Sequence, residues 1–176
     1  MIKVLYPFTM SFLDYPDPDS HALVVYFVGC SHTCPGCQNK DLQNPKYNKN
    51  VKKFNDDWKL IELICEDSRK FKTKKIVLSG GDPLYSEASR EFVRTLLSHK
   101  YYFGFEICIY TGFTLEDIDN FGIDDFDFCK CGKYDESLKQ RPCKTDNMIR
   151  LASKNQVIYD VAWNRVSNDG QYIFNK

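Results

Sequence analysis

Three cysteines stand close together near the start of the chain. Cys30, Cys34 and Cys37 follow one another in the order Cys-x3-Cys-x2-Cys on a single short stretch. Thiolate sulfur is a soft ligand that suits zinc or iron–sulfur clusters. Structural zinc sites take four protein ligands, and closed iron–sulfur clusters take four thiolates. Three thiols therefore leave one metal position open, and an open position indicates chemistry at the metal.

The thiol loop alone leaves a structural zinc site as an alternative, in which His32 or a distant cysteine completes the ligands. We expect His32 to be exposed or hydrogen-bonded rather than a ligand. Residues 1–6 lack the long apolar stretch of a signal peptide, so we do not expect the eight cysteines to form a disulfide framework. The reducing cytoplasm is the predicted location, where such thiols bind metal or do redox work.

The composition is that of an ordinary globular protein. The 176 residues are 43% hydrophobic and 27% charged, which predicts a single domain over residues 1–176. Lys plus Arg and Asp plus Glu are equal at 24 each, so no electrostatic footprint for nucleic acid is present. No apolar stretch is long enough to cross a bilayer. We therefore expect neither nucleic acid nor a membrane as a partner.

The apolar run at residues 22–28 is β-branched and aromatic, and it predicts a buried strand that Gly29 ends. Residues 2–20 are rich in Pro and Asp, which indicates turns and extended backbone, and residues 139–154 look irregular and polar. Further strands are predicted at 75–79, 103–110, 126–131 and, as the last strand, 156–163. Helices are predicted at 56–70, from Ser86 onward, and at 114–119 with Thr114 as the cap.

Apolar residues at helical spacing predict which side of two helices is buried. In the helix at 56–70 these residues are Trp58, Ile61, Ile64 and Cys65, and in the helix that begins at Ser86 they are Phe92, Val93, Leu96 and Leu97.

Strand, loop and helix alternate at short intervals, which predicts parallel βα units in an α/β fold. Four or five such units are too few for a closed eight-stranded barrel, which typically needs about 250 residues. The expected fold is a partial, open (βα) barrel of mostly parallel strands.

Several polar or glycine-rich loops directly follow predicted strands. Gly80, Gly81 and Asp82 follow one strand, and Thr111 with Gly112 follows the next. Because the carboxyl ends of parallel strands meet on one side of a sheet, we expect these loops to surround one cavity with the thiols. Paired glycines let the backbone approach a ligand closely, and Asp82 can accept hydrogen bonds from an ammonium group.

Together these motifs resemble the radical S-adenosylmethionine (SAM) enzymes. More narrowly, the chain is similar to the activating proteins of anaerobic (class III) ribonucleotide reductases. The resemblance covers most of the chain and rests on the following motifs: the thiol loop, Ser-Phe-Leu-Asp-Tyr-Pro at 11–16, Ser-Gly-Gly-Asp-Pro-Leu at 79–84, Tyr-Thr-Gly at 110–112, Asp127-x-x-Lys130-x-Gly132-x-Tyr134, and Asn155-Gln156.

The resemblance implies a cofactor, a reaction and a partner. Cys30, Cys34 and Cys37 would hold a 4Fe-4S cluster whose open iron binds the amino and carboxylate groups of SAM. The reduced cluster, recharged by an electron donor such as flavodoxin, would cleave SAM to methionine and a 5′-deoxyadenosyl radical. That radical would remove a hydrogen from a glycine of the large anaerobic ribonucleotide reductase subunit.

The resemblance also implies the cofactor-binding residues: Gly36, Cys37, Gln38, Gly80, Gly81, Asp82, Thr111 and Lys130. Many members of the superfamily place an aromatic residue near the adenine where this chain has Gly36, so Gly36 and Gln38 would meet the adenine through backbone groups. Asp127 and Lys130 would contact the cofactor or pair with each other. Residues 139–154 would rim the opening through which the reductase glycine enters.

The remaining cysteines leave alternatives open. Cys129, Cys131 and Cys143 could form a second metal site, but we expect reduced thiols, since Cys129 and Cys131 are predicted to point to opposite faces of a strand. Cys65 and Cys108 are predicted to lie in the core. Two other functions stay open as well: a small-molecule radical SAM enzyme resembling carboxy-deazaguanine synthase, and a non-catalytic zinc-binding module.

Overall fold

A large mixed sheet forms the centre of the computed structural model, which describes residues 1–18 and 21–174. The strands of this sheet are β1 (Ile2–Leu5), β2 (Thr9–Ser11), β3 (Ala22–Phe27), β4 (Val51–Phe54), β5 (Lys75–Gly80), β6 (Glu106–Tyr110), β7 (Phe128–Cys131) and β10 (Val157–Asp160). A second, three-stranded sheet contains β8 (Cys143–Thr145), β9 (Met148–Arg150) and β11 (Gln171–Ile173). The helices are α1 (Lys40–Gln43), α2 (Asp57–Phe71), α3 (Glu87–Ser98), α4 (Lys100–Phe103), α5 (Leu115–Asn120) and the 3-10 turn η1 (Glu136–Leu138).

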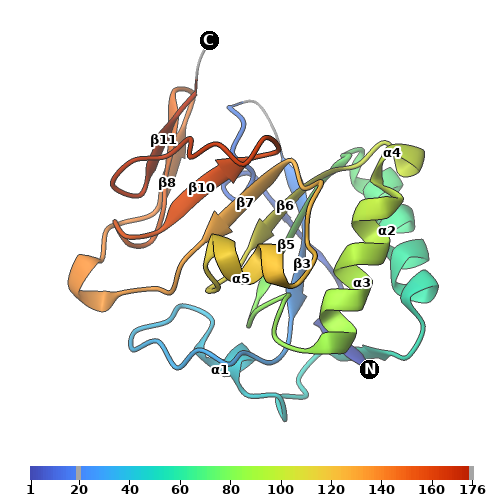
Figure 1. The fold of residues 1–176 in the computed structure, drawn as a ribbon. Coiled ribbons are helices and arrows are strands. Elements are labelled where there is room, and N and C mark those ends of the chain that lie inside the picture. The colour runs from blue at the N-terminus through green and yellow to red at the C-terminus, as the bar shows by residue number, and fades with distance from the viewer. Residues whose placement is uncertain (19–20, 175–176) are drawn as a thin grey trace.

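The parallel part of the large sheet is its middle. The strand order is β10-β7-β6-β5-β3-β1-β4, with β2 also paired to β3 (Figure 1). Strands β3, β5, β6 and β7 pair in parallel, whereas β1, β2, β4 and β10 join antiparallel. The prediction of mostly parallel strands therefore holds only for this middle, and the sheet as a whole is a mixed α/β sheet.

Helices α2 and α3 cover one face of the sheet (Figure 1). Asp56 caps α2 by accepting a hydrogen bond from the backbone N–H of Trp58, and Ser86 caps α3 in the same way from Ser89. The predicted buried side of α3 is confirmed. On α2, Ile61, Ile64 and Cys65 are buried as predicted, but Trp58 is 47% exposed. Trp58 lies in the first turn, where its ring contacts His99 at 4.8 Å instead of the sheet.

The other face of the sheet is covered by chain from both ends. Tyr15 packs there against Ala22, Val24, Val77 and Cys108. The small sheet adds a second cluster, which consists of Ile149, Leu151, Ile158 and Phe174 and packs against Phe128. The parallel strands are thus buried on both faces, which explains their unbroken apolar sequences.

The structure differs from the sequence predictions at four places. Residues 2–20 contain strands β1 and β2, because Ile2 and Val4 are buried and pair with β4; of the predicted turn residues, Asp19 and Ser20 lie outside the described residues. Strand β6 begins at Glu106, since residues 100–103 form the short helix α4 that ends at Gly104 with φ of 66°. Residues 139–154 contain β8 and β9, and β11 follows β10, so β10 is not the last strand.

The predicted helix at 114–119 is confirmed as α5, and Thr114 and Asp117 form a capping box at its start. Within residues 1–18 and 21–174, none of the helices is both long and apolar enough to cross a membrane.

Candidate functional site

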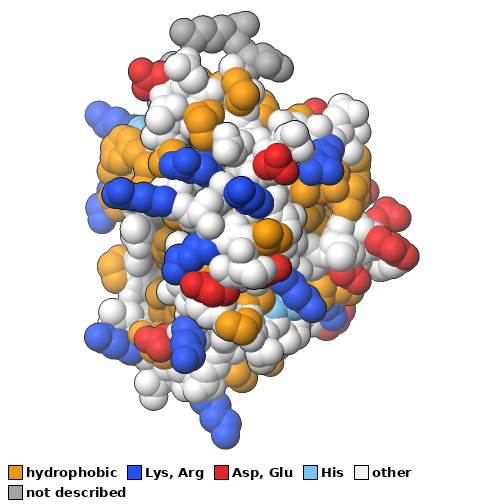
Figure 2. Space-filling model, turned by 90° about the vertical axis from the view of Figure 1, so that its left-hand side faces the viewer, with side chains coloured by type: hydrophobic (Ala, Val, Ile, Leu, Met, Phe, Trp, Pro, Cys, Tyr) orange, Lys and Arg blue, Asp and Glu red, His pale blue; other side chains and the backbone are white. Residues whose placement is uncertain are grey.

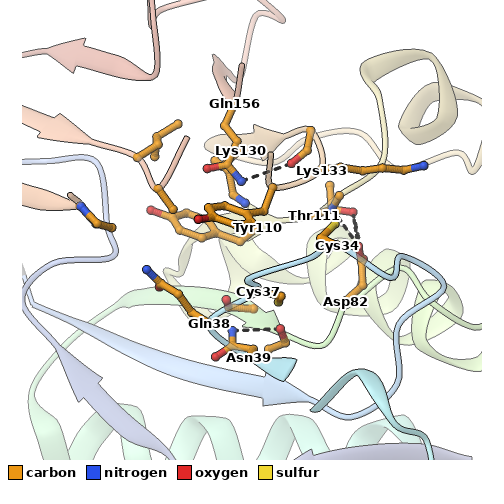
Figure 3. A pocket seen from close by; sticks show the side chains of 18 of the residues that line it. Cys34, Cys37, Gln38, Asn39, Asp82, Tyr110, Thr111, Lys130, Lys133 and Gln156 are labelled. Atoms are coloured by element: carbon orange, nitrogen blue, oxygen red, sulfur yellow. Dashed lines mark hydrogen bonds between the residues drawn. The ribbon is translucent and has the colours of Figure 1, made fainter. Parts of the chain in front are cut away.

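The loops that follow β3, β5, β6 and β7 meet around one cavity of about 310 Å³ (Figure 3). This confirms that the motifs converge at the carboxyl ends of the parallel strands. The predicted site residues that line the cavity are Cys30, Cys34, Cys37, Gln38, Gly80, Gly81, Asp82, Thr111 and Lys130. Gly36 is the exception, because it lies at a second, neighbouring cavity. The roles of these residues in binding stay predictions.

The thiol loop is anchored mainly at its beginning. The backbone N–H of Gly29 donates to Leu42 O at 2.8 Å, and that of Cys30 donates to Gln43 O at 3.2 Å. Gly29 has φ of 111°, and the ring of Tyr85 lies 2.5 Å from the point where a Cβ would be. No other residue fits this turn without strain. The loop therefore starts from a rigid point and carries three half-buried thiols into the cavity.

The donor set fits a cluster with three protein ligands, provided that the loop closes. The three thiols are free and share one cavity. Within residues 1–18 and 21–174, no three His, Cys, Asp or Glu side chains are close enough to hold a metal ion as they stand. Burial raises the pKa of the Cys30 thiol to about 11. Binding as a thiolate would release this proton, as metal sites generally require.

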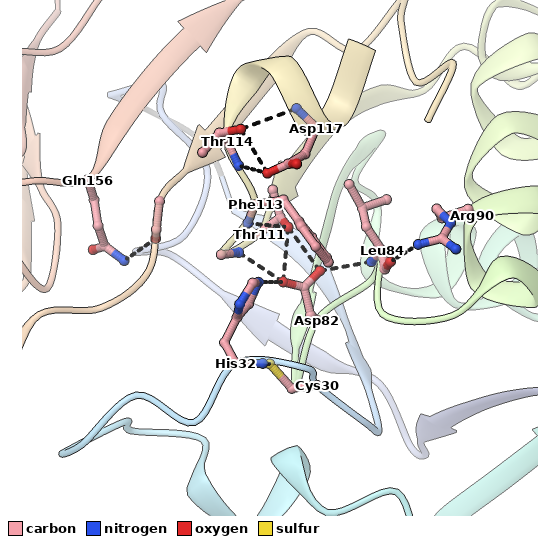
Figure 4. A network of polar contacts seen from close by, with 12 residues as sticks. Cys30, His32, Asp82, Leu84, Arg90, Thr111, Phe113, Thr114, Asp117 and Gln156 are labelled. Atoms are coloured by element: carbon pink, nitrogen blue, oxygen red, sulfur yellow. Dashed lines mark hydrogen bonds and ion pairs between the residues drawn. The ribbon is translucent and has the colours of Figure 1, made fainter. Parts of the chain in front are cut away.

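Asp82 ties two of the loops together (Figure 4). The side chain is 1% exposed, and its carboxylate accepts hydrogen bonds from Leu84 N at 2.9 Å, Thr111 Oγ1 at 2.9 Å and Gly112 N at 2.8 Å. Burial raises the pKa of this carboxyl group. The chain's own donors thus already bond to this carboxylate, and a bond from it to a ligand's ammonium group stays a prediction. The geometry makes Asp82 a residue that positions the loops after β5 and β6.

His32 is buried beside Asp82, which the sequence did not indicate. Its side chain is 8% exposed, and its ring meets the ring of Phe113 edge-on at 4.6 Å. Its Nε2 lies 3.6 Å from Asp82 Oδ2 and has no hydrogen-bond partner among the described residues. The prediction that His32 is exposed or hydrogen-bonded was therefore wrong, because the ring is buried and its Nε2 atom neither accepts nor donates a hydrogen bond among the described residues. Burial lowers the pKa of His32, which favours the neutral ring.

The two glycines after β5 are needed for packing between loops. At Gly80, with φ of 108°, a Cβ would lie 2.5 Å from the backbone of Phe27. At Gly81, a Cβ would collide with the carbonyl oxygen of Gly29 and lie 2.6 Å from that of Leu42. Side chains at these positions would thus push the thiol loop away from β5.

Lys130 and Asp127 do not pair with each other, so that alternative was wrong. Lys130 projects into the cavity, with Nζ 5.0 Å from the centre of the Tyr110 ring (Figure 3). Loss of water around the ammonium group lowers its pKa. Asp127 instead accepts hydrogen bonds from Ile107 N at 2.7 Å and from the buried Lys100 Nζ at 3.2 Å. Lys130 is therefore available to a ligand, whereas Asp127 holds the fold.

The other cysteines do not gather into a second site. Cys131 donates from its thiol to Cys129 Sγ at 3.6 Å, so both sulfurs lie on the same face of β7. The prediction of opposite faces was wrong, because residues two apart on a strand share a face. Cys143 lies elsewhere, on the wall of the cavity. Cys65 and Cys108 are buried in the core, as predicted.

The small sheet, whose segment 139–154 was predicted to rim the opening but not to form strands, supplies a wall of the cavity. Residues from β8, β9 and the segment before β10 line it, namely Cys143, Ile149, Arg150, Leu151 and Gln156. The predicted contact segment 139–154 thus lies beside the cavity. Strands β8 and β9 pair with each other as a hairpin, and β9 also pairs with β11, which is distant in sequence and which no local pattern indicates.

Comparisons with known proteins identify a family and several relatives of this chain. Residues 21–159 match a family model described as a 4Fe-4S single cluster domain. A protein of Escherichia coli (strain K12), named anaerobic ribonucleoside-triphosphate reductase-activating protein, is 27% identical over 139 residues, which cover 77% of this chain and 85% of the relative. The protein of that name from Enterobacteria phage T4 is 27% identical over 128 residues, 71% of this chain and 78% of its own length. The Salmonella typhimurium protein of the same name is 27% identical over 139 residues, again 77% of this chain and 85% of its own.

Proposed function

Because this chain belongs to the family described as a 4Fe-4S single cluster domain, we propose that it activates an anaerobic ribonucleotide reductase as a radical SAM enzyme. The observation that carries the proposal is the meeting of the thiol loop with the loops after β5, β6 and β7 at one cavity. The names of the relatives from Escherichia coli and phage T4 support the choice of reaction partner.

The proposal assigns the strands β3, β5, β6 and β7 to a partial, open barrel. In it, Cys30, Cys34 and Cys37 are the cluster ligands, and one iron is left open. When bound, the cluster and SAM would supply an electron and a 5′-deoxyadenosyl radical for removing hydrogen from a glycine of the reductase. Supporting this, the parallel strands and the small sheet enclose the cavity on opposite sides, which limits access of water to a radical.

The chain's own residues would bind and orient SAM. Gly80, Gly81 and Thr111 line the cavity, where the small glycines let the backbone approach its methionine part closely. Lys130 offers a positive charge to its carboxylate, and Gln38 meets the adenine. Gly36 can add only backbone contacts, because Glu136 and Tyr134 fill the space where its side chain would be.

The partner in this proposal is the large reductase subunit, and the electron donor is a protein such as flavodoxin. Free buried thiols beside the site support a reducing compartment such as the cytoplasm.

The test is glycyl-radical formation on the large reductase. The reductase of the same organism is mixed anaerobically with the reconstituted protein, SAM and a reductant, and the radical is measured by electron paramagnetic resonance. A radical signal that is absent with the Cys34→Ala variant supports the proposal. If the wild-type protein binds zinc but no iron or acid-labile sulfide, it is a zinc module and the proposal fails.

A further inference from the structure

A second cavity adjoins the cofactor cavity beside the thiol loop. Gln38, Tyr134, Pro142 and Ala152 line both spaces. Gly36 lies on the floor of this second space, which we call the outer groove. Because Gly36 and Gln38 flank Cys37 in the chain, the outer groove runs directly beside the third cysteine.

The wall of the outer groove is preformed. It consists of the segment that includes Gln140, whose N–H donates to Ala152 O at 2.9 Å. The side chain of Gln140 donates to Gly170 O at 3.2 Å, and Lys154 N donates to Leu138 O at 3.0 Å. These bonds fasten the wall to the small sheet. A ligand therefore meets a rigid surface, which reduces the entropy lost on binding.

The charges along this path are mostly positive. Lys139 and Arg141 are the charged residues that line the outer groove, and both are exposed. The Glu136 carboxylate lies against Gly36 at the floor of the groove and pairs with Lys139 at 3.0 Å. Within the described residues no carboxylate pairs with the Arg141 guanidinium, so Arg141 carries the unbalanced positive charge of the groove. Three more cations line the cofactor cavity, namely Lys130, Lys133 and Arg150.

The acidic residues do not balance these cations. Asp14 and Asp82 are the acids that line the cofactor cavity, and Asp82 is occupied by the chain's own donors. Figure 2 looks onto the side of the molecule that carries the small sheet and shows Lys and Arg spread across it, with few Asp and Glu between them. The positive field is therefore local, since the whole chain has a net charge of zero.

We propose that the outer groove receives an extended segment of the large reductase, in which acidic residues flank the reacting glycine. The inference rests on the proposed function and adds the path and the charge of the substrate segment. A reaction at a glycine Cα requires polypeptide backbone to enter the cavity, and glycine alone has no side chain to block that approach. A cationic groove that adjoins the cavity provides the path and attracts anionic flanks.

The experiment compares two charge reversals in the reconstituted protein. Arg141→Glu changes the outer groove, and Lys154→Glu makes the same change at an exposed residue of the same segment that lines neither cavity. Affinity for the large reductase is measured at low and high salt. Reductant-driven SAM cleavage without reductase and the thermal unfolding midpoint are measured in parallel.

We expect Arg141→Glu to weaken reductase binding about tenfold at low salt, with less effect at high salt, as for a charge at an interface. Lys154→Glu should change binding less than about twofold, and SAM cleavage alone should stay at the wild-type level in both variants. If both variants weaken binding equally, the effect comes from the net charge of the protein, and the outer groove is not the binding site. Unchanged binding of Arg141→Glu would refute the proposal as well. If the wild-type protein binds no reductase at all, the proposed function fails together with the groove.

Discussion

The Nε2 atom of His32 lies 3.6 Å from Oδ2 of Asp82, and this contact joins the thiol loop to the turn after β5. The distance is too long for a hydrogen bond, although both side chains are buried. A buried polar atom without a partner costs about 1–3 kcal/mol. Closure of the thiol loop around a cluster can shorten this contact and remove that cost. We therefore expect His32 to couple cluster binding to the shape of the SAM site.

Replacing His32 tests this coupling. His32→Phe keeps the packing against Phe113 but removes the ring nitrogens, so we expect iron and sulfide content to stay near wild type while SAM affinity falls about tenfold, the loss of roughly one hydrogen bond to a charged group. His32→Gln retains a donor and should recover most of the affinity. Equilibrium dialysis with SAM measures both variants, and His99→Phe, at the end of α3, is the control. Wild-type affinity in His32→Phe would refute the coupling.

The cysteines separate into ligands and core residues. Changing Cys30, Cys34 or Cys37 to Ala should abolish SAM cleavage, because each removes one of the proposed cluster ligands. Changing Cys65 or Cys108 to Ala should leave the iron content unchanged and cost about 1–2 kcal/mol of stability through the small cavity created. Iron analysis and chemical unfolding distinguish the two groups. Loss of the cluster from Cys65→Ala or Cys108→Ala would contradict the assignment.

We expect a side chain at position 81 to displace the thiol loop rather than to block SAM binding directly. In Gly81→Val the new side chain meets the carbonyl oxygens of Gly29 and Leu42, so we expect a loss of about 1–3 kcal/mol in stability and poor cluster assembly. Gly104→Asn is the control, because a side chain there has open space and Asn tolerates a positive φ. Normal cluster content with weakened SAM binding in Gly81→Val would instead mean that this side chain projects into the SAM site.

Lys130 is the side chain we expect to bind SAM through charge. Lys130→Met keeps the aliphatic stem against Tyr110 and removes the ammonium group. SAM affinity should fall about tenfold, as for loss of one charge-assisted contact, while cluster content and stability stay close to wild type. Dialysis and chemical unfolding measure the two effects. Unchanged affinity would assign Lys130 to packing alone.

Replacing Asp127, in contrast to Lys130, should lower stability and leave SAM affinity unchanged. Asp127→Ala leaves Lys100, which is 1% exposed, with only Asp125 at 3.4 Å and removes the acceptor for Ile107 N. Removing one partner of a buried ion pair is strongly destabilising, and with one partner left we expect a loss of about 2 kcal/mol. SAM affinity of the folded protein should not change. A selective loss of SAM affinity, with stability unchanged, would mean that Asp127 acts at the cofactor.

The features that could be predicted from the sequence are those that depend on neighbouring residues. The apolar run of β3, the glycine that ends it, the spacing of the three thiols and the capping box at Thr114 were all recognisable, because each acts within a few residues. The convergence of the strand-end loops also followed, since the geometry of parallel βα units brings them to one side of the sheet.

Contacts between side chains that are far apart in the chain arise only when the chain is folded. The burial of His32 against Asp82, the pairing of Asp127 with Lys100 and the pairing of β9 with β11 depend on segments that are far apart in sequence. The free energy of such contacts comes from burial and from satisfying polar atoms, and both depend on which partner the fold supplies. Local patterns carry no information about that partner, so the pairing of β9 with β11 and the role of His32 could be found only in three dimensions.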